Sequence, residues 1–287
     1  MPFQNHFVDI GLRLHVREWP GDQTPFVLLH GLSSNCRTWE AVAACLAAAG
    51  HRVVTVDQRG HGLSDKPSEG YDFATITADL SRLLAALSLE QPIVVGQSWG
   101  GNVVLEFGAR YPDLARGLGF VDGGFLDLQA RPNATWESVA AELRPPDLNG
   151  TPREILKQSI RVSHADWTDE GIEATLANFE TLPDGTIRRQ LDLANHMAIL
   201  QAMWDQRPQT LYPQVTAPVL ICVAHSGDDW SERKRKLVAA AQTGLPRSEA
   251  HWFPATDHDI HVHRPNALAE LFLQAQHGIW GVDISAR

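Results

Sequence analysis

A serine in a glycine-flanked turn is the residue whose chemistry is easiest to predict in this sequence. Ser98 stands in GQSWG (residues 96–100), between an apolar run at residues 92–95 and a helical stretch at residues 102–110. A serine hydroxyl is a weak nucleophile, and a sharp strand-to-helix turn exposes it to a base and to a carbonyl carbon. The flanking glycines have no Cβ, so neighbouring chain can approach closely. We therefore predict that Ser98 is a nucleophile at the start of a helix, where free N–H groups favour negative charge.

Histidines near the C-terminus could supply the base that a serine nucleophile requires. His258, His261 and His263 lie in one short stretch. Because imidazoles also bind metals, a metal site is the alternative for this cluster. We favour the base and predict no metal and no cofactor, since the three residues share one short loop and the serine turn already explains the need for one of them.

Alternating strand and helix patterns surround these residues. A hairpin at residues 7–17 comes first, and the strand at residues 26–29 is apolar throughout, which favours a central place in a sheet. This order implies right-handed crossovers and a mainly parallel sheet in an α/β fold. Further strands are expected at residues 52–57, 118–121, 219–223 and 250–253, and helices at 38–49, 75–87, 230–241 and 265–276.

The alternation of strand and helix patterns is interrupted between residues 125 and 214. This stretch has helical segments, no convincing strand, and breaks at residues 144–146 and 183–185. We interpret it as an inserted helical cap over an α/β core made of residues 1–124 and 215–287. Its aromatic side chains are expected to pack the cap together more often than to line a pocket.

Composition excludes several classes of protein. The chain has 287 residues, 44% of them hydrophobic, and a net charge of −10, which disfavours nucleic-acid partners because phosphates would be repelled. Three cysteines without C-x-x-C spacing (Cys36, Cys45, Cys222) argue against disulfides and a cysteine zinc site. Neither a signal peptide nor an apolar run of about 18 residues is found. The expectation is a cytoplasmic protein without membrane partners, and a homodimer is compatible with the sequence.

Several motifs in a fixed order resemble the α/β-hydrolase family, over nearly the whole chain. They are HG at residues 30–31, DQRGHGLS at 57–64, GQSWGG at 96–101, DH at 257–258 and RP at 264–265. Within the family, the chain is most similar to cap-bearing esterases, lactonases, C–C hydrolases and perhydrolases. The resemblance implies a central sheet flanked by helices and a serine-based mechanism.

The resemblance also implies roles for individual residues. Ser98 corresponds to the nucleophile and His258 to the general base, seven residues before Pro265 as is usual in the family. This chain departs from the family pattern in having Asp257 in place of a glycine and His263 in place of a glutamate. His261 and His263 are then expected to lie at the surface or to face the cap.

The acid that orients the base has three candidates. Asp122 ends the strand at residues 118–121, a position that a known variant of the family uses, and we favour it narrowly. Asp228 comes next and Asp229 third, because both stand at the commonest family position but lack the usual W-G-x-x-D context.

Backbone N–H groups of Leu32 and Trp99 are expected to form the oxyanion hole. His30, Gly31 and Trp39 are expected to line the substrate pocket, whereas the 57–64 loop is expected to be structural. The implied substrate is a small apolar ester or lactone, since no arginine stands beside the serine turn.

Other activities share the same motifs. C–C bond hydrolases, perhydrolases and acyltransferases use the same triad, and cofactor-free dioxygenases keep a His–Asp pair. Dehalogenases and epoxide hydrolases are excluded by Ser98, because they use an aspartate at that position. A slow ligand receptor on the same fold is the alternative from outside the enzymes.

Overall fold

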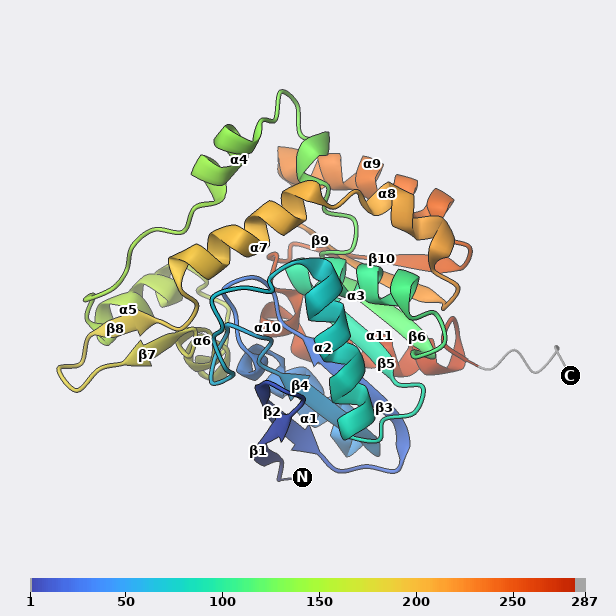
Figure 1. Ribbon diagram of the computed structural model, residues 1–287, viewed down its shortest axis with the longest axis horizontal. Helices are drawn as coiled ribbons and strands as arrows, with labels where there is room; N and C mark the ends of the chain where they lie inside the picture. The colour runs from blue at the N-terminus through green and yellow to red at the C-terminus, as the bar shows by residue number, and fades with distance from the viewer. Residues whose placement is uncertain (1, 282–287) are drawn as a thin grey trace, which may run out of the picture.

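An eight-stranded sheet forms the centre of the protein (Figure 1). The computed structural model describes residues 2–281, so residue 1 and residues 282–287, the two ends of the expected core, lie outside the described part. The strand order is β1-β2-β4-β3-β5-β6-β9-β10; β1 and β2 pair antiparallel, as do β2 and β4, and all other neighbours pair parallel. This confirms the expected hairpin and the mainly parallel sheet. The strands are β1 (Gln4–Asp9), β2 (Arg13–Trp19), β3 (Gln23–Leu29), β4 (His51–Val56), β5 (Ile93–Gln97), β6 (Gly117–Val121), β9 (Val219–His225) and β10 (Ser248–Pro254).

Helices cover both faces of the sheet because its central strands are apolar on both sides. In β3, Phe26 and Leu28 face one hydrophobic cluster, whereas Val27 and Leu29 face the other, as the two-residue period of a strand requires. The first cluster includes side chains of α1 and α11, and the second includes those of α2, α3 and α9. The bounds are α1 (Glu40–Ala48), α2 (Phe73–Ala86), α3 (Trp99–Arg110), α9 (Asp229–Gly244) and α11 (Pro265–His277).

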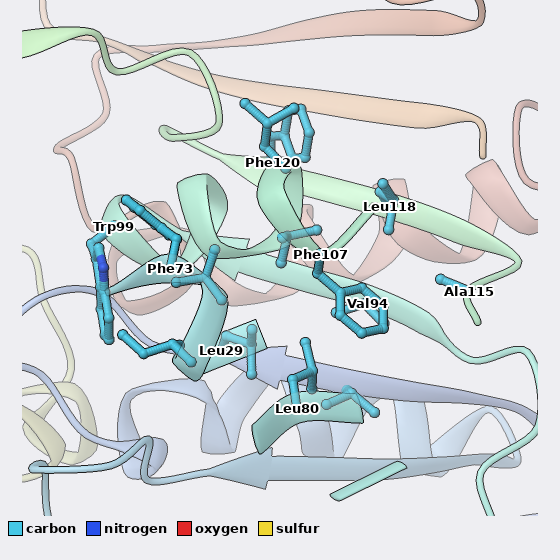
Figure 2. Close-up of a cluster of buried hydrophobic side chains, with 14 of the residues drawn as sticks. Leu29, Phe73, Leu80, Val94, Trp99, Phe107, Ala115, Leu118 and Phe120 are labelled. Atoms are coloured by element: carbon cyan, nitrogen blue, oxygen red, sulfur yellow. The ribbon is translucent and has the colours of Figure 1, made fainter. Parts of the chain in front are cut away.

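The larger cluster fills the space between α2, α3 and the sheet (Figure 2). Phe107 of α3 and Phe120 of β6 are both fully buried there. Burying a side chain of this size stabilises the fold by about 1.5–3 kcal/mol relative to leaving it exposed. The cluster extends to Trp99, so the packing that stabilises the sheet also fixes the residue next to Ser98.

The chain between β6 and β9 forms helices and one small hairpin. The expectation that this segment has no strand is wrong: β7 (Phe179–Thr181) and β8 (Ile187–Arg189) pair antiparallel. Residues 183–185, expected to separate helices, form the hairpin turn, where Gly185 has a φ of +80° that favours glycine. The other elements are η2 (Leu128–Ala130), α4 (Trp136–Leu143), α5 (Arg153–Ser163), α6 (Asp169–Leu176), α7 (Leu193–Asp205), α8 (Pro208–Leu211) and η3 (Tyr212–Gln214).

This segment lies beside the sheet, with α4, α5, β7 and β8 at its outer edge in Figure 1. It contacts loops that follow strands of the sheet: Ser33, after β3, is bonded to His196 of α7, and Asp257, after β10, accepts a hydrogen bond from Trp167. The segment therefore meets the core where parallel strands end. We propose that it acts as the cap of the candidate site.

Two further sequence expectations can be compared with the structure. Within residues 2–281, no helix has the length and apolar character needed to cross a membrane. The three cysteines are all free, and Cys36 and Cys222 are buried.

A short helix that the sequence did not predict, α10 (Ile260–His263), follows His258. Another short element, η1 (Cys36–Trp39), precedes α1.

Candidate active site

The turn at Ser98 has the strained geometry that its sequence suggests. Ser98 lies between β5 and α3 with φ +53° and ψ −121°, in the half of backbone space that side chains rarely adopt. A Cβ at Gly96 would lie 2.1 Å from the carbonyl oxygen of Gly100, and one at Gly100 would lie 2.6 Å from that of His30. The close approach expected from the two glycines is therefore present.

The structure brings His258 to Asp122. The Nδ1 atom of His258 lies 2.6 Å from Oδ2 of Asp122, which is buried directly after β6. Neighbouring strands β5 and β6 end together, and the Ser98 N–H donates to the carbonyl of Val121 at 2.9 Å. Asp122 itself has a φ of +44°, and its Oδ1 accepts a hydrogen bond from the Ala224 N–H at 3.0 Å. Backbone bonds thus hold the serine and the carboxylate on adjacent strand ends.

The other two carboxylates lie elsewhere. Asp228 caps α9 and accepts hydrogen bonds from the backbone N–H and the hydroxyl of Ser231, both at 2.8 Å. These bonds lower the pKa of the Asp228 carboxyl. Asp229 is the first residue of α9. Neither is bonded to His258 in the described chain, so among the three candidates it is Asp122 that contacts His258.

A buried lysine also contacts Asp122, and sequence reasoning missed it. Lys234 Nζ lies 3.0 Å from each oxygen of the Asp122 carboxylate. Its side chain belongs to a basic run that resembles a solvated helix surface. Helical spacing was the available signal, because Lys234 falls on the same buried face of α9 as Ser231, Val238 and Ala241.

Charges around His258 act in opposite directions. Desolvation by the surrounding side chains lowers the pKa of His258, although 47% of its side chain is exposed, whereas the hydrogen bond and the charge of Asp122, together with the charge of Asp259, raise it. Lys234 lowers it again, and the net result is a pKa above the usual histidine value. An ionised Asp122 accepts the Nδ1–H, which leaves the Nε2 lone pair of neutral His258 free to take a proton.

One residue of the loop after β3 and the first residue of α3 lie near Ser98 and carry backbone N–H groups that are free in the described part of the chain. The backbone N–H groups of Leu32 and Trp99 are not committed to an acceptor among the described residues, since Trp99 is the first residue of its helix. Ser33 holds this loop in place: its N–H donates to His61 Nε2 at 3.2 Å, and its hydroxyl bonds His196 Nδ1 at 2.8 Å. His61 in turn stacks on the Trp99 ring, with centroids 5.3 Å apart.

Two cavities meet at Leu32, Ser98 and His258. One, of about 290 Å³, is mostly apolar and includes side chains of the β6–β9 segment. The other, of about 170 Å³, is mostly polar. The first is lined also by Trp99, Leu126, Asp127, Leu128, Arg131, Leu143, His196, Leu200, Met203 and Trp230, and the second by Gly31, Ser33, Ser34, Thr38, Gln97, Thr175, Asn178, Asp259 and Val262.

Two residues expected at the pocket lie behind it instead. Trp39 is fully buried and packs on His261, with ring centroids 4.5 Å apart. His30 is also fully buried, and its Nε2 accepts the Gln58 N–H at 3.1 Å. Both positions were inferred from their nearness in sequence to the loop after β3, but their side chains point into the core. Gly31, in contrast, does line the polar cavity.

The remaining histidines and the 57–64 loop are structural. His261 is buried without a hydrogen-bond partner in the described chain, and burial lowers its pKa to about 3. His263 is buried too, so the surface position expected for these two is wrong, although His263 does face the β6–β9 segment through Asp166 at 2.5 Å. In the 57–64 loop, Asp57 accepts hydrogen bonds from the backbone of Cys36 and Leu63, which agrees with a structural role.

Two groups of side chains in the described residues have metal-ligating types within reach of one another. One contains His15, Cys36 and Asp57, and the other Asp166, Asp257 and His263. In the first, His15 Nδ1 is bonded to Asp57 at 2.7 Å, and burial raises the pKa of the Cys36 thiol. In the second, each acid is already bonded to an imidazole or indole N–H. Ordinary hydrogen bonding therefore accounts for both groups.

Known proteins resemble the chain in sequence and in structure. A putative non-heme chloroperoxidase of Synechocystis is 42% identical over 91 residues, 32% of this chain and 33% of that protein. A 2-(acetamidomethylene)succinate hydrolase of Mesorhizobium japonicum is 32% identical over 252 residues, 83% of this chain and 81% of that protein. The crystal structure of an E-2-(acetamidomethylene)succinate hydrolase matches with a TM-score of 0.79 at 23% identity, covering 95% of this chain and 98% of that one. Residues 24–264 match the family model described as the alpha/beta hydrolase fold, and the chain therefore belongs to that family.

Proposed function

We propose that the protein is a serine hydrolase that cleaves a carboxylic ester or lactone through an acyl-enzyme on Ser98. The observation on which this rests is the 2.6 Å contact between His258 Nδ1 and Asp122 Oδ2, at a site where Ser98 and His258 line the same two cavities. A serine, an imidazole and a carboxylate in this relation are the groups that acyl transfer requires.

In the proposed reaction, His258 takes the Ser98 proton on Nε2 as the hydroxyl oxygen attacks the ester carbonyl. Asp122 holds the imidazole in the tautomer with hydrogen on Nδ1 and stabilises the imidazolium that forms. The N–H groups of Leu32 and Trp99 stabilise the oxyanion, a contribution of about 2.7–4 kcal/mol for each donor of this kind. His258 then protonates the leaving group, and a water activated by the same base releases the acid.

The two cavities suggest which part of the substrate lies on each side of Ser98. Leucine and methionine side chains give the larger cavity an apolar lining, which suits an aliphatic or aromatic acyl group. The smaller cavity presents hydroxyl, amide and carboxyl groups, which suit a polar leaving group and the attacking water. Arg131 lines the larger cavity, so the argument from sequence that no arginine stands near Ser98 does not hold in the structure. Its partner Glu142, at 2.9 Å, is exposed, and such a surface pair is weak, so Arg131 can also pair with a carboxylate on the substrate.

Hydrolysis of short and medium p-nitrophenyl esters tests the proposal. The wild type should release a burst of nitrophenol equal to the enzyme concentration, and Ser98→Ala should abolish both burst and turnover. Ser68→Ala, which removes an exposed serine hydroxyl, is the matched control and should retain full activity. An inert wild type, or an active Ser98→Ala variant, would contradict ester hydrolysis and direct attention to C–C cleavage, peracid formation, oxygenation or ligand reception.

A further inference from the structure

We propose that Lys234 is a positioning residue of the candidate active site, which fixes the Asp122 carboxylate and offsets part of its negative charge at His258. Lys234 lies in the middle of α9 and is only 2% exposed. The role of Lys234 in turnover rests on the proposed function, whereas its effect on the protonation of the His258 ring does not.

The lysine ammonium has an acceptor for each of its three protons. Two are the carboxylate oxygens of Asp122, each at 3.0 Å, and the third is the carbonyl oxygen of Ala224. An ammonium offers three donors and no acceptor, so this set satisfies it completely without water. The complete set also leaves it a single orientation, which a solvated lysine would not have.

The same contacts leave the carboxylate no freedom to rotate. Oδ1 of Asp122 accepts the Ala224 N–H and one Lys234 proton, while Oδ2 accepts a second Lys234 proton and the His258 Nδ1–H. Rotation of the carboxylate would break bonds on both oxygens. Lys234 therefore holds Oδ2 in the direction from which it can meet the imidazole.

The charge of Lys234 matters because several charged or titratable groups surround His258. Asp122 approaches from the end of β6, Lys234 from α9, Asp259 is the next residue in the chain, and His261 follows in α10. Two carboxylates without a cation would favour the imidazolium strongly. An imidazole that stays protonated at neutral pH cannot take a proton from Ser98, so the ammonium extends the pH range in which His258 is a base.

An NMR titration of the His258 ring tests the charge effect without any substrate. Lys234→Met removes the charge and the donors, Lys234→Gln removes the charge but keeps N–H donors, and Lys234→Arg keeps the charge. The pKa of His258 should rise by about one pH unit in Lys234→Met and Lys234→Gln, because a positive charge close to the imidazole has been removed. Lys234 Nζ and His258 Nδ1 contact the same Asp122 oxygen, at 3.0 and 2.6 Å. The His258 pKa should stay near the wild-type value in Lys234→Arg. Lys236→Met removes an equal but exposed charge from the same helix and should also leave it unchanged.

If the His258 pKa in folded Lys234→Gln equals that of the wild type, the proposal is overturned. A rise in Lys234→Arg as large as that in Lys234→Met would overturn it as well, because charge would not be the cause. If Lys234→Met does not fold, the His258 pKa measured in Lys234→Gln tests the charge effect in its place.

The activity measurement separates this inference from the proposed function. Below the His258 pKa, kcat/KM falls about tenfold per pH unit, so a shift of one unit lowers kcat/KM of Lys234→Gln about tenfold at pH 6. A wild type without esterase activity contradicts the proposed function but leaves the titration result valid. If the wild type is active and the acid limb of kcat/KM lies at the same pH in Lys234→Gln, the lysine is purely structural and the inference is contradicted. This holds even where the variant has a lower thermal stability.

Discussion

Replacing Asp122 by asparagine should leave the fold of the site but give His258 the wrong tautomer. Both carboxylate oxygens receive a Lys234 proton, but only the Oδ1 position also receives the fixed backbone N–H of Ala224, so the amide oxygen must occupy the Oδ1 position. The amide NH₂ then takes the Oδ2 position, 2.6 Å from His258 Nδ1, where it can only donate. His258 must accept with Nδ1 and carry its proton on Nε2, and it cannot then deprotonate Ser98.

The size of the effect follows from this geometry. Where an asparagine replaces the acid of a Ser-His-Asp enzyme and reverses the tautomer, kcat falls about 10⁴-fold. That loss corresponds to about 5 kcal/mol of barrier at about 1.36 kcal/mol per tenfold change. The variant should also unfold at lower urea concentration, because Lys234 loses its counter-charge, and breaking a buried ion pair costs about 3–5 kcal/mol.

The assay measures kcat on a p-nitrophenyl ester for folded Asp122→Asn, with Asp228→Asn as the matched control. Asp228→Asn keeps a good cap residue, so its kcat should stay at the wild-type value and its stability should change by less than about 1 kcal/mol. A folded Asp122→Asn variant within tenfold of the wild-type kcat would refute the reasoning. So would an equal loss in Asp228→Asn.

Four further outcomes are expected. Gly96→Ala should fail to give soluble, active protein, because its Cβ would lie 2.1 Å from the Gly100 carbonyl oxygen; circular dichroism and ester turnover measure this, and a folded, active variant contradicts it. Trp280→Ala should lower the free energy of unfolding by about 3–5 kcal/mol in urea titration, since this side chain is buried; a change below 1 kcal/mol speaks against it. The wild-type kcat/KM should fall as pH decreases through the raised His258 pKa, since only the neutral ring accepts a proton. An acid limb centred below the ordinary histidine pKa of about 6.5 conflicts with the Asp122 contact. The same raised pKa stabilises the folded state below the unfolded pKa of His258, and that contribution is lost as pH rises through the folded value, which urea titrations at pH 6 and 9 can detect.

Local patterns were sufficient to predict the strands of the eight-stranded sheet, the main helices and the turn at Ser98. GQSWG lies between an apolar strand and a helix, and each of these features is decided within about ten residues of chain. Asp122 was harder, because two strand ends each present a carboxylate. Which carboxylate contacts His258 depends on how two loops 136 residues apart in sequence pack together. The periodicity of a local segment does not predict such a contact.

The features that the sequence did not reveal depend on long-range contacts or on very short elements. Lys234 resembles its exposed neighbours in type, and its partner Asp122 lies 112 residues away. Trp39 was placed at the pocket by proximity in sequence, although its ring packs on His261 in the core. Strands β7 and β8 have three residues each, which is too short for an alternating pattern to be recognised.

The position of the carboxylate at the end of β6 also has a consequence for how this protein can diversify. Because Asp122 supplies the contact to His258, the connection between β9 and α9 has no reacting group to hold in register. Asp228 serves there only as a helix cap, and such surface connections tolerate insertions and sequence change. Helix α9, which follows, does not tolerate such changes at Lys234, because this residue bonds the helix to Asp122. A new loop sequence that keeps a residue able to cap α9 at position 228 can therefore be accepted without loss of the contacts among Asp122, Lys234 and His258, whereas a change of register in α9 cannot.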